Sequence, residues 1–180
     1  MQTRLVLILA LVTSCVAGAR LCAQTALAVR GAFVYNVLNF VEWPATVLPP
    51  GNTPLRVVVV APGPQPQFEA ALAGRSIKGH PLVVETVHDP ERIDDAHVVF
   101  ITADAVSLLR PVLRRIDGRA ILTLTEQSLD TPVDTIVALG IKDAKLAFSV
   151  NLDLADDVGL QIAPNLLKLA KNVKTSRGKR

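Results

Sequence analysis

The residues that could carry chemistry in this 180-residue chain are few and widely spaced. Three histidines, His80, His88 and His97, could bind a metal in principle, but no two of them stand four residues apart as ligands on one helix face would. The Gly-x-Ser-x-Gly nucleophile elbow and the glycine patterns of dinucleotide and phosphate loops are missing. His97 follows Asp94-Asp95-Ala96, where a carboxylate could orient its ring, and a structural histidine is the favoured interpretation. We therefore expect no enzymatic activity, no cofactor and no metal.

Both cysteines, Cys15 and Cys22, lie in an N-terminal segment typical of a secretory signal peptide. Arg4 supplies a positive charge, an apolar run follows, and small residues come next. The segment is shorter than the about 20 apolar residues that a membrane-spanning helix needs. We expect residues 1–23 to be cleaved, so that the mature chain begins at Gln24, in the periplasm, without a cysteine for a disulfide or a metal. The stretch Val12-Thr13-Ser14-Cys15 also fits a lipoprotein box, which leaves a lipid anchor on Cys15 as the alternative.

The charges divide unevenly along the chain. Residues 24–167 carry 11 basic and 16 acidic side chains, whereas the last thirteen residues carry six basic side chains and no acidic one. A nucleic-acid-binding surface needs spread basic residues with stacking aromatics, and this chain has one Trp and one Tyr. We therefore expect no nucleic-acid partner and interpret the basic C-terminus as a solvated helix end.

Two segments combine polar side chains with an apolar stripe. In the first, Tyr35, Asn36 and Trp43 accompany apolar residues at helical spacing; they could contact a partner or ligand, or form the polar face of a core helix. Trp43 precedes a proline, so it is either an exposed anchor or, as the favoured interpretation, a core side chain. In the second, Phe148 and Asn151 are further candidate contacts, although Asn151 also fits a helix N-cap.

These side chains must be positioned by a single α/β domain, expected over residues 24–175 with a basic tail at 176–180. Short β-branched runs alternate with amphipathic segments, which predicts a three-layer sandwich around a mostly parallel sheet, with a C-terminal antiparallel hairpin. The predicted strands are 55–61, 81–87, 97–102 and 120–125, and the hairpin strands are 135–141 and 145–150. The predicted helices are 24–43, 66–73, 103–116 with a kink or break at Pro111, a segment that begins at Asn151, and 164–174.

The two unusual segments together resemble the YfiR family, whose members begin with a helix of the type Lys-Ala-Ala-Phe-Leu-Tyr-Asn-Phe and continue to a Trp-Pro pair. Four further stretches match the family in order, and the resemblance covers nearly all of residues 24–173. The matching residues are Arg30-Gly-Ala-Phe-Val-Tyr-Asn-Val-Leu-Asn-Phe-Val-Glu-Trp-Pro44, Gly74-Arg-Ser-Ile-Lys-Gly-His-Pro-Leu82, Ala96-His-Val-Val-Phe100, Phe148-Ser-Val-Asn-Leu152 with Gly159-Leu160, and Leu166-Leu-Lys-Leu-Ala170.

The resemblance implies a periplasmic regulator that binds and represses an inner-membrane diguanylate cyclase or related sensor and so controls cyclic-di-GMP and biofilm formation. It also implies relief by an outer-membrane lipoprotein; a homodimer and a small-molecule-binding module remain alternatives. The chain departs from the family at Ala96, where a cysteine often stands, and at Val133-Asp134, where a glycine pair is usual. Redox control through disulfides therefore does not carry over, and the entry to the hairpin is expected to differ in shape.

Overall fold

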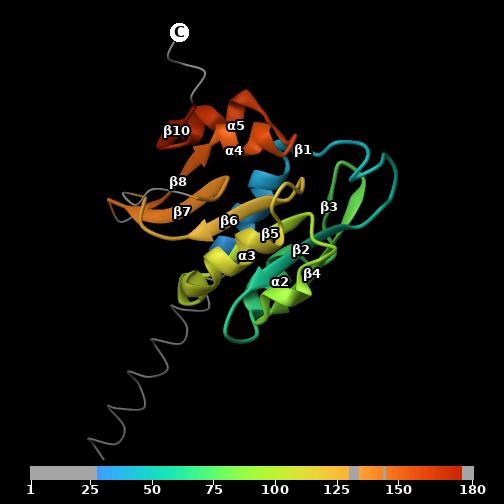
Figure 1. Cartoon of the computed structure of the whole chain (residues 1–180), viewed down its shortest axis with the longest axis horizontal. Coiled ribbons are helices and arrows are strands. Elements are labelled where there is room, and N and C mark those ends of the chain that lie inside the picture. The colour runs from blue at the N-terminus through green and yellow to red at the C-terminus, as the bar shows by residue number, and fades with distance from the viewer. Residues whose placement is uncertain (1–27, 130–133, 144, 176–180) are drawn as a thin grey trace, which may run out of the picture.

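Ten short strands form the sheets in the part of the chain that the structure describes, and their bounds are β1 Val41–Glu42, β2 Leu55–Val60, β3 Ser76–Ile77, β4 His80–Val87, β5 Val98–Ile101, β6 Leu122–Glu126, β7 Val137–Lys142, β8 Lys145–Asn151, β9 Gln161–Ile162 and β10 Asn172–Lys174. This computed structural model describes residues 28–129, 134–143 and 145–175. Eight strands form one sheet in the order β10-β8-β7-β6-β5-β2-β4-β3, and β1 pairs with β9 (Figure 1). In the large sheet only β3–β4 and β7–β8 are antiparallel. The predicted mostly parallel sheet with a C-terminal antiparallel hairpin is confirmed.

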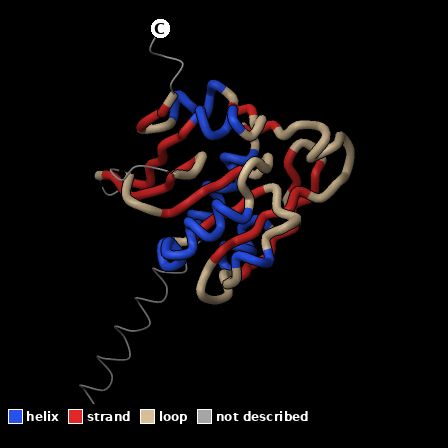
Figure 2. Tube along the Cα trace, viewed as in Figure 1, coloured by secondary structure: helices blue, strands red, loops and turns tan. Residues whose placement is uncertain are grey.

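Helices cover both faces of this sheet (Figure 2). Residue alternation along β2 shows the two faces, because Val57 and Val59 enter one core whereas Val58 and Val60 enter the other. The first core also takes side chains from a first helix at residues 28–38, α2 Pro66–Leu72, α4 Leu152–Asp157 and α5 Pro164–Leu169. The second core takes them from the 3-10 helix Ala103–Leu108 and from α3 Leu109–Arg115, with its C-terminal neighbour Ile116. The fold is therefore the expected three-layer α/β sandwich.

The first helix ends earlier than its apolar stripe predicts. Helix was expected as far as Trp43, but the helix ends at residue 38 and the chain turns into β1. The amide of Phe40 donates to the carbonyl of Val37 at 2.9 Å, and the Asn39 side chain donates to the carbonyl of Tyr35 at 2.9 Å, which closes the last turn. Pairing of β1 with β9 then holds the following residues extended. Residues 24–27 of the predicted helix lie outside the described residues.

The segment predicted as one helix over 103–116 is divided. A 3-10 helix comes first and α3 follows, so the break that Pro111 was expected to require occurs just before it. Pro111 then stands in the first turn of α3, where backbone N–H groups have no partner within the helix.

The C-terminal prediction was wrong beyond Leu169. The helix that was expected to reach Lys174 ends at Leu169, and β10 adds to the sheet beside β8. The amide of Lys171 donates to the carbonyl of Phe148 at 2.8 Å, and this bond begins the new strand. Lys171 and Lys174 therefore lie at and on an edge strand and not at a helix end.

A tight hairpin of β3 and β4 was not predicted. Lys78 and Gly79 join the strands with φ values of 50° and 92°, which are the left-handed conformations that a two-residue hairpin turn requires. Among the described residues, no helix is both long and apolar enough to cross a membrane.

Candidate functional site around Trp43

Trp43 lies where the chain leaves β1, and it is half-buried. Its ring packs against the edge of the first core, and its indole Nε1 donates to the carbonyl of His97 at 3.2 Å. The bond satisfies the only polar atom of the side chain and ties β1 to the start of β5. The predicted core role of Trp43 therefore describes one part of the ring, and the other part remains accessible.

A hollow of about 200 Å³ opens beside Trp43. Its apolar lining comes from β1 and the residue after it, from the loop before β2, from the start of β2 and from β3, while its polar lining comes from β1, the β3–β4 turn and the start of β4. The lining residues are Val41, Glu42, Trp43, Leu48, Leu55, Ile77, Lys78 and His80.

An ion pair stands among the lining side chains of the hollow. Lys78 Nζ lies 3.0 Å from Glu42 Oε1 and 3.4 Å from the carbonyl of Val41. Both side chains are about half exposed, so the pair is screened by solvent and can exchange its partners at low cost. The hollow is thus lined by one aromatic ring, several aliphatic side chains and an ion pair with one charge of each sign.

Two histidines support the loop that frames the hollow. His80 Nδ1 lies 2.8 Å from the carbonyl of Thr53, and His97 Nδ1 accepts a hydrogen bond from the amide of Arg56 at 3.1 Å. Burial lowers the pKa of His97, and the nearby Arg56 charge adds to this, whereas a hydrogen bond with the backbone of Val47 opposes it. Because an acceptor Nδ1 requires the neutral ring, His97 acts as a structural acceptor. Its ring is oriented by a backbone amide, not by a carboxylate.

Tyr35 contacts the β3–β4 hairpin, and Trp43 lines the hollow beside it. The Tyr35 hydroxyl donates to the carbonyl of Ser76 at 3.5 Å, and the Arg75 guanidinium lies 4.5 Å from the centre of the Tyr35 ring. Asn36 is exposed on the same helix. Of the candidate residues in the first segment, Tyr35 and Trp43 therefore lie beside the same hairpin.

Phe148 and Asn151 are not part of this region's hollow. Phe148 is buried, with its ring centre 5.3 Å from that of Phe33. Asn151 is 3% exposed, and its side chain accepts from the amide of Leu154 at 3.4 Å, which confirms the predicted N-cap at the start of α4. Both residues hold the fold together. The prediction instead missed Lys78 and His80, because only tertiary folding brings the hairpin turn beside Trp43.

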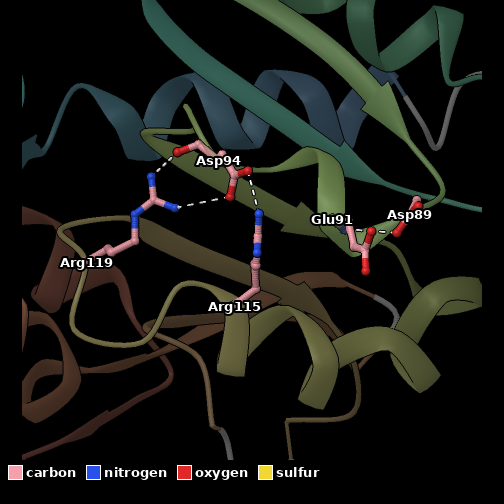
Figure 3. Close-up of polar contacts among 5 residues, drawn as sticks. All are labelled: Asp89, Glu91, Asp94, Arg115 and Arg119. Carbon is pink, nitrogen blue, oxygen red and sulfur yellow. Dashed lines mark hydrogen bonds and ion pairs between the residues drawn. The ribbon is translucent and has the colours of Figure 1, made fainter.

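On the face of the sheet opposite the first core, Asp94 forms ion pairs with two arginines (Figure 3). Its carboxylate lies 2.5 Å from Arg115 Nη2 and 4.0 Å from Arg119 Nη1, and Arg119 also donates to its backbone carbonyl. The hydrogen bond to Asp94, together with the Asp94 charge, raises the pKa of Arg115. Because the carboxylate is occupied by cations, this cluster fastens α3 to the turn before β5 and leaves no free base. Within the described ranges, no group of three or more His, Cys, Asp or Glu residues could hold a metal ion.

Comparison with known proteins gives a family and a fold. A family model described as YfiR/HmsC-like matches residues 27–171. Among solved structures, the chain is similar to the ABC domain from Streptococcus pneumonia in complex with L-Trp, at 12% identity and a TM-score of 0.51, over 67% of this chain and 55% of that one. It is also similar to a conserved domain protein from Vibrio cholerae O1 biovar El Tor, at 14% identity and a TM-score of 0.47, over 72% and 57% of the two chains. The chain spans little more than half of either structure, and the first likeness shows the α/β fold alone.

Proposed function

The chain belongs to the YfiR/HmsC-like family, and on that premise we propose that it is a periplasmic protein that binds and represses an inner-membrane diguanylate cyclase or a related sensor. The family is one of regulators of cyclic-di-GMP signalling and not of enzymes. The proposal includes relief of this repression by an outer-membrane lipoprotein. The observation that supports this proposal is the family match over residues 27–171, which includes every residue that lines the Trp43 hollow.

The dimensions of the hollow favour a protein partner over a free small molecule. Sites for small ligands usually enclose about 300–1,000 Å³, whereas this hollow measures about 200 Å³ and opens beside an aromatic ring and an exposed ion pair. One or two side chains of a partner fill such a space, and half-buried tryptophans are common anchors in protein interfaces. We therefore assign the Trp43 hollow to partner contact.

The second candidate is a small-molecule-binding module, and the same hollow is the observation that favours it. A ligand that binds the folded chain alone raises its melting temperature. Screening amino acids, nucleotides and other metabolites by thermal melting therefore tests this candidate. A ligand that stabilises the wild type but not Trp43→Ala would support it.

The proposed function is tested first by gene deletion. Loss of the gene should raise cyclic-di-GMP, measured with a fluorescent reporter in the native host, and expression of the wild-type chain should restore the lower level. A reporter that does not change on deletion would contradict the proposed function.

The Trp43 hollow is tested by charge reversal at its ion pair. Glu42→Lys should weaken repression and raise cyclic-di-GMP while the melting temperature stays close to that of the wild type, because exposed ion pairs contribute only about 0–1 kcal/mol. Arg110→Glu is the matched control, since it breaks an exposed pair with Asp134 elsewhere on the chain. If Glu42→Lys and Arg110→Glu repress equally well, the hollow is not part of the surface that contacts the partner.

A further inference from the structure

Strand β10 forms one end of the large sheet, and within the described part of the chain no strand pairs with its outer edge (Figure 1). It runs parallel to β8, with Asn172 opposite Ser149 and Lys174 opposite Asn151. The amide of Asn151 donates to the carbonyl of Ile136 on the β7 side, so Ser149 and Asn151 face β7, and the parallel register then directs Asn172 and Lys174 to β8. The N–H and C=O groups of Val173 therefore point away from the sheet. All three residues of β10 are exposed.

The surroundings of this edge are basic. Lys168, Lys171 and Lys174 are exposed, none of them takes part in an ion pair among the described residues, and no acidic residue follows Asp157 in the sequence.

The same edge also exposes apolar side chains. Leu169 is 69% exposed and Val173 is 38% exposed, which places them among the few large apolar side chains on the described surface. The edge thus combines unpaired backbone groups, positive charge and apolar surface.

We propose that β10 receives an extended acidic segment of a partner protein, which adds to the sheet as a further strand. The outward backbone groups of Val173 supply the hydrogen bonds, the lysines pair with carboxylates of the segment, and the side chains of Leu169 and Val173 contact its apolar side chains. This deepens the proposed function by naming a second contact with the partner. The edge lies just past residue 171, where the match to the family model ends.

The charges decide between the occupants of this edge. A second copy of the chain that paired through its own β10 would bring lysines next to lysines, and edge lysines are a common device against such pairing. An anionic lipid surface would attract the lysines but would not depend on a single outward N–H group. An acidic strand satisfies the charges and the backbone together.

The test uses a fluorescent peptide of alternating glutamate and valine, with a lysine–valine peptide as its control. The purified chain should bind the acidic peptide and not the basic one, as measured by fluorescence anisotropy. Val173→Pro removes the outward N–H, is compatible with an edge strand, and should weaken binding by up to about tenfold, more than Val173→Ala, which keeps that N–H. Lys174→Glu should weaken it as well, whereas Lys145→Glu, which reverses an exposed lysine of β8 in the same sheet, should not.

Melting curves establish that each variant is folded, and Lys174→Glu with its matched control decides the question if Val173→Pro does not fold. Peptide binding that is unaffected by Val173→Pro or by Lys174→Glu would overturn the proposal. So would binding to phosphatidylglycerol vesicles that requires Lys174 but not the Val173 N–H, without peptide binding. If gene deletion raises cyclic-di-GMP but the β10 variants repress fully and bind the peptide normally, the β10 proposal fails while the proposed function stands.

Discussion

His97 shows how one neutral side chain can organise a surface without taking part in chemistry. Its Nδ1 accepts from Arg56, and its carbonyl accepts from both the Trp43 indole and the amide of Leu122. The residue therefore joins β2, β5 and β6 to the loop that frames the Trp43 hollow. Protonation of Nδ1 would remove an acceptor and place a charge beside Arg56.

We expect acid to destabilise the protein through His97. Its pKa is lowered in the folded state, so the unfolded chain binds more protons and stability falls as the pH drops below about 6.5, the unfolded value, towards the folded pKa. The melting temperature should drop by a few degrees between pH 7.5 and pH 5. His97→Gln should reduce this drop, and His88→Gln, at an exposed position, should leave it unchanged. A pH dependence identical in wild type and His97→Gln would assign the acid sensitivity to other groups.

Asn151 tests whether a candidate contact residue is structural. Asn151→Ala should lower the free energy of unfolding by about 1 kcal/mol, because it removes the side-chain acceptor at the N-terminus of α4. Asn151→Asp keeps the acceptor and should retain most of the stability and all of the repression in cells. Chemical denaturation beside the cyclic-di-GMP reporter makes the comparison. Loss of repression in a stable Asn151→Asp would instead make this residue a contact.

At the scale of elements, the approach of the first helix to α2 depends on Gly31. A Cβ added at this position would lie 2.7 Å from the Ala71 Cβ and 2.9 Å from the carbonyl oxygen of Phe68. Neither atom belongs to a long flexible side chain, so one helix must move to accept a methyl group. The glycine thus sets the distance between two helices that cover the same face of the sheet.

Gly31→Ala should therefore destabilise the protein by about 1–3 kcal/mol through overpacking, although alanine is intrinsically the better helix former. Gly63→Ala is the control, because no atom lies within 4 Å of an added Cβ there. Urea unfolding measures both. A Gly31→Ala chain that is as stable as wild type would show that the two helices are free to separate.

At the scale of the whole molecule, the proposed role requires export. We expect the mature protein to begin at Gln24, or close to it, after removal of a signal peptide. Intact-mass measurement on protein from the periplasmic fraction checks this start. A diacylglycerol-bearing species that begins at Cys15 would establish the lipoprotein alternative, and an uncleaved cytoplasmic chain would contradict both forms of export.

The sequence by itself determined the α/β class, the central strands, the C-terminal hairpin and the N-cap at Asn151. These features are local: β-branched runs such as Val57–Val60 form buried strands in any parallel sheet, and an N-cap bonds an amide three residues away. The family could also be recognised from such segments, because they keep their order along the chain.

Only the tertiary structure decided where the first helix ends, that β10 replaces a predicted helical turn, and which residues surround Trp43. Strands of two or three residues, such as β1 and β10, have no periodicity of their own, and partners distant in sequence select them by hydrogen bonding. The same holds for the contact of Glu42 with Lys78. A candidate site assembled from such contacts depends on the packing of distant elements, which no local pattern of side chains specifies.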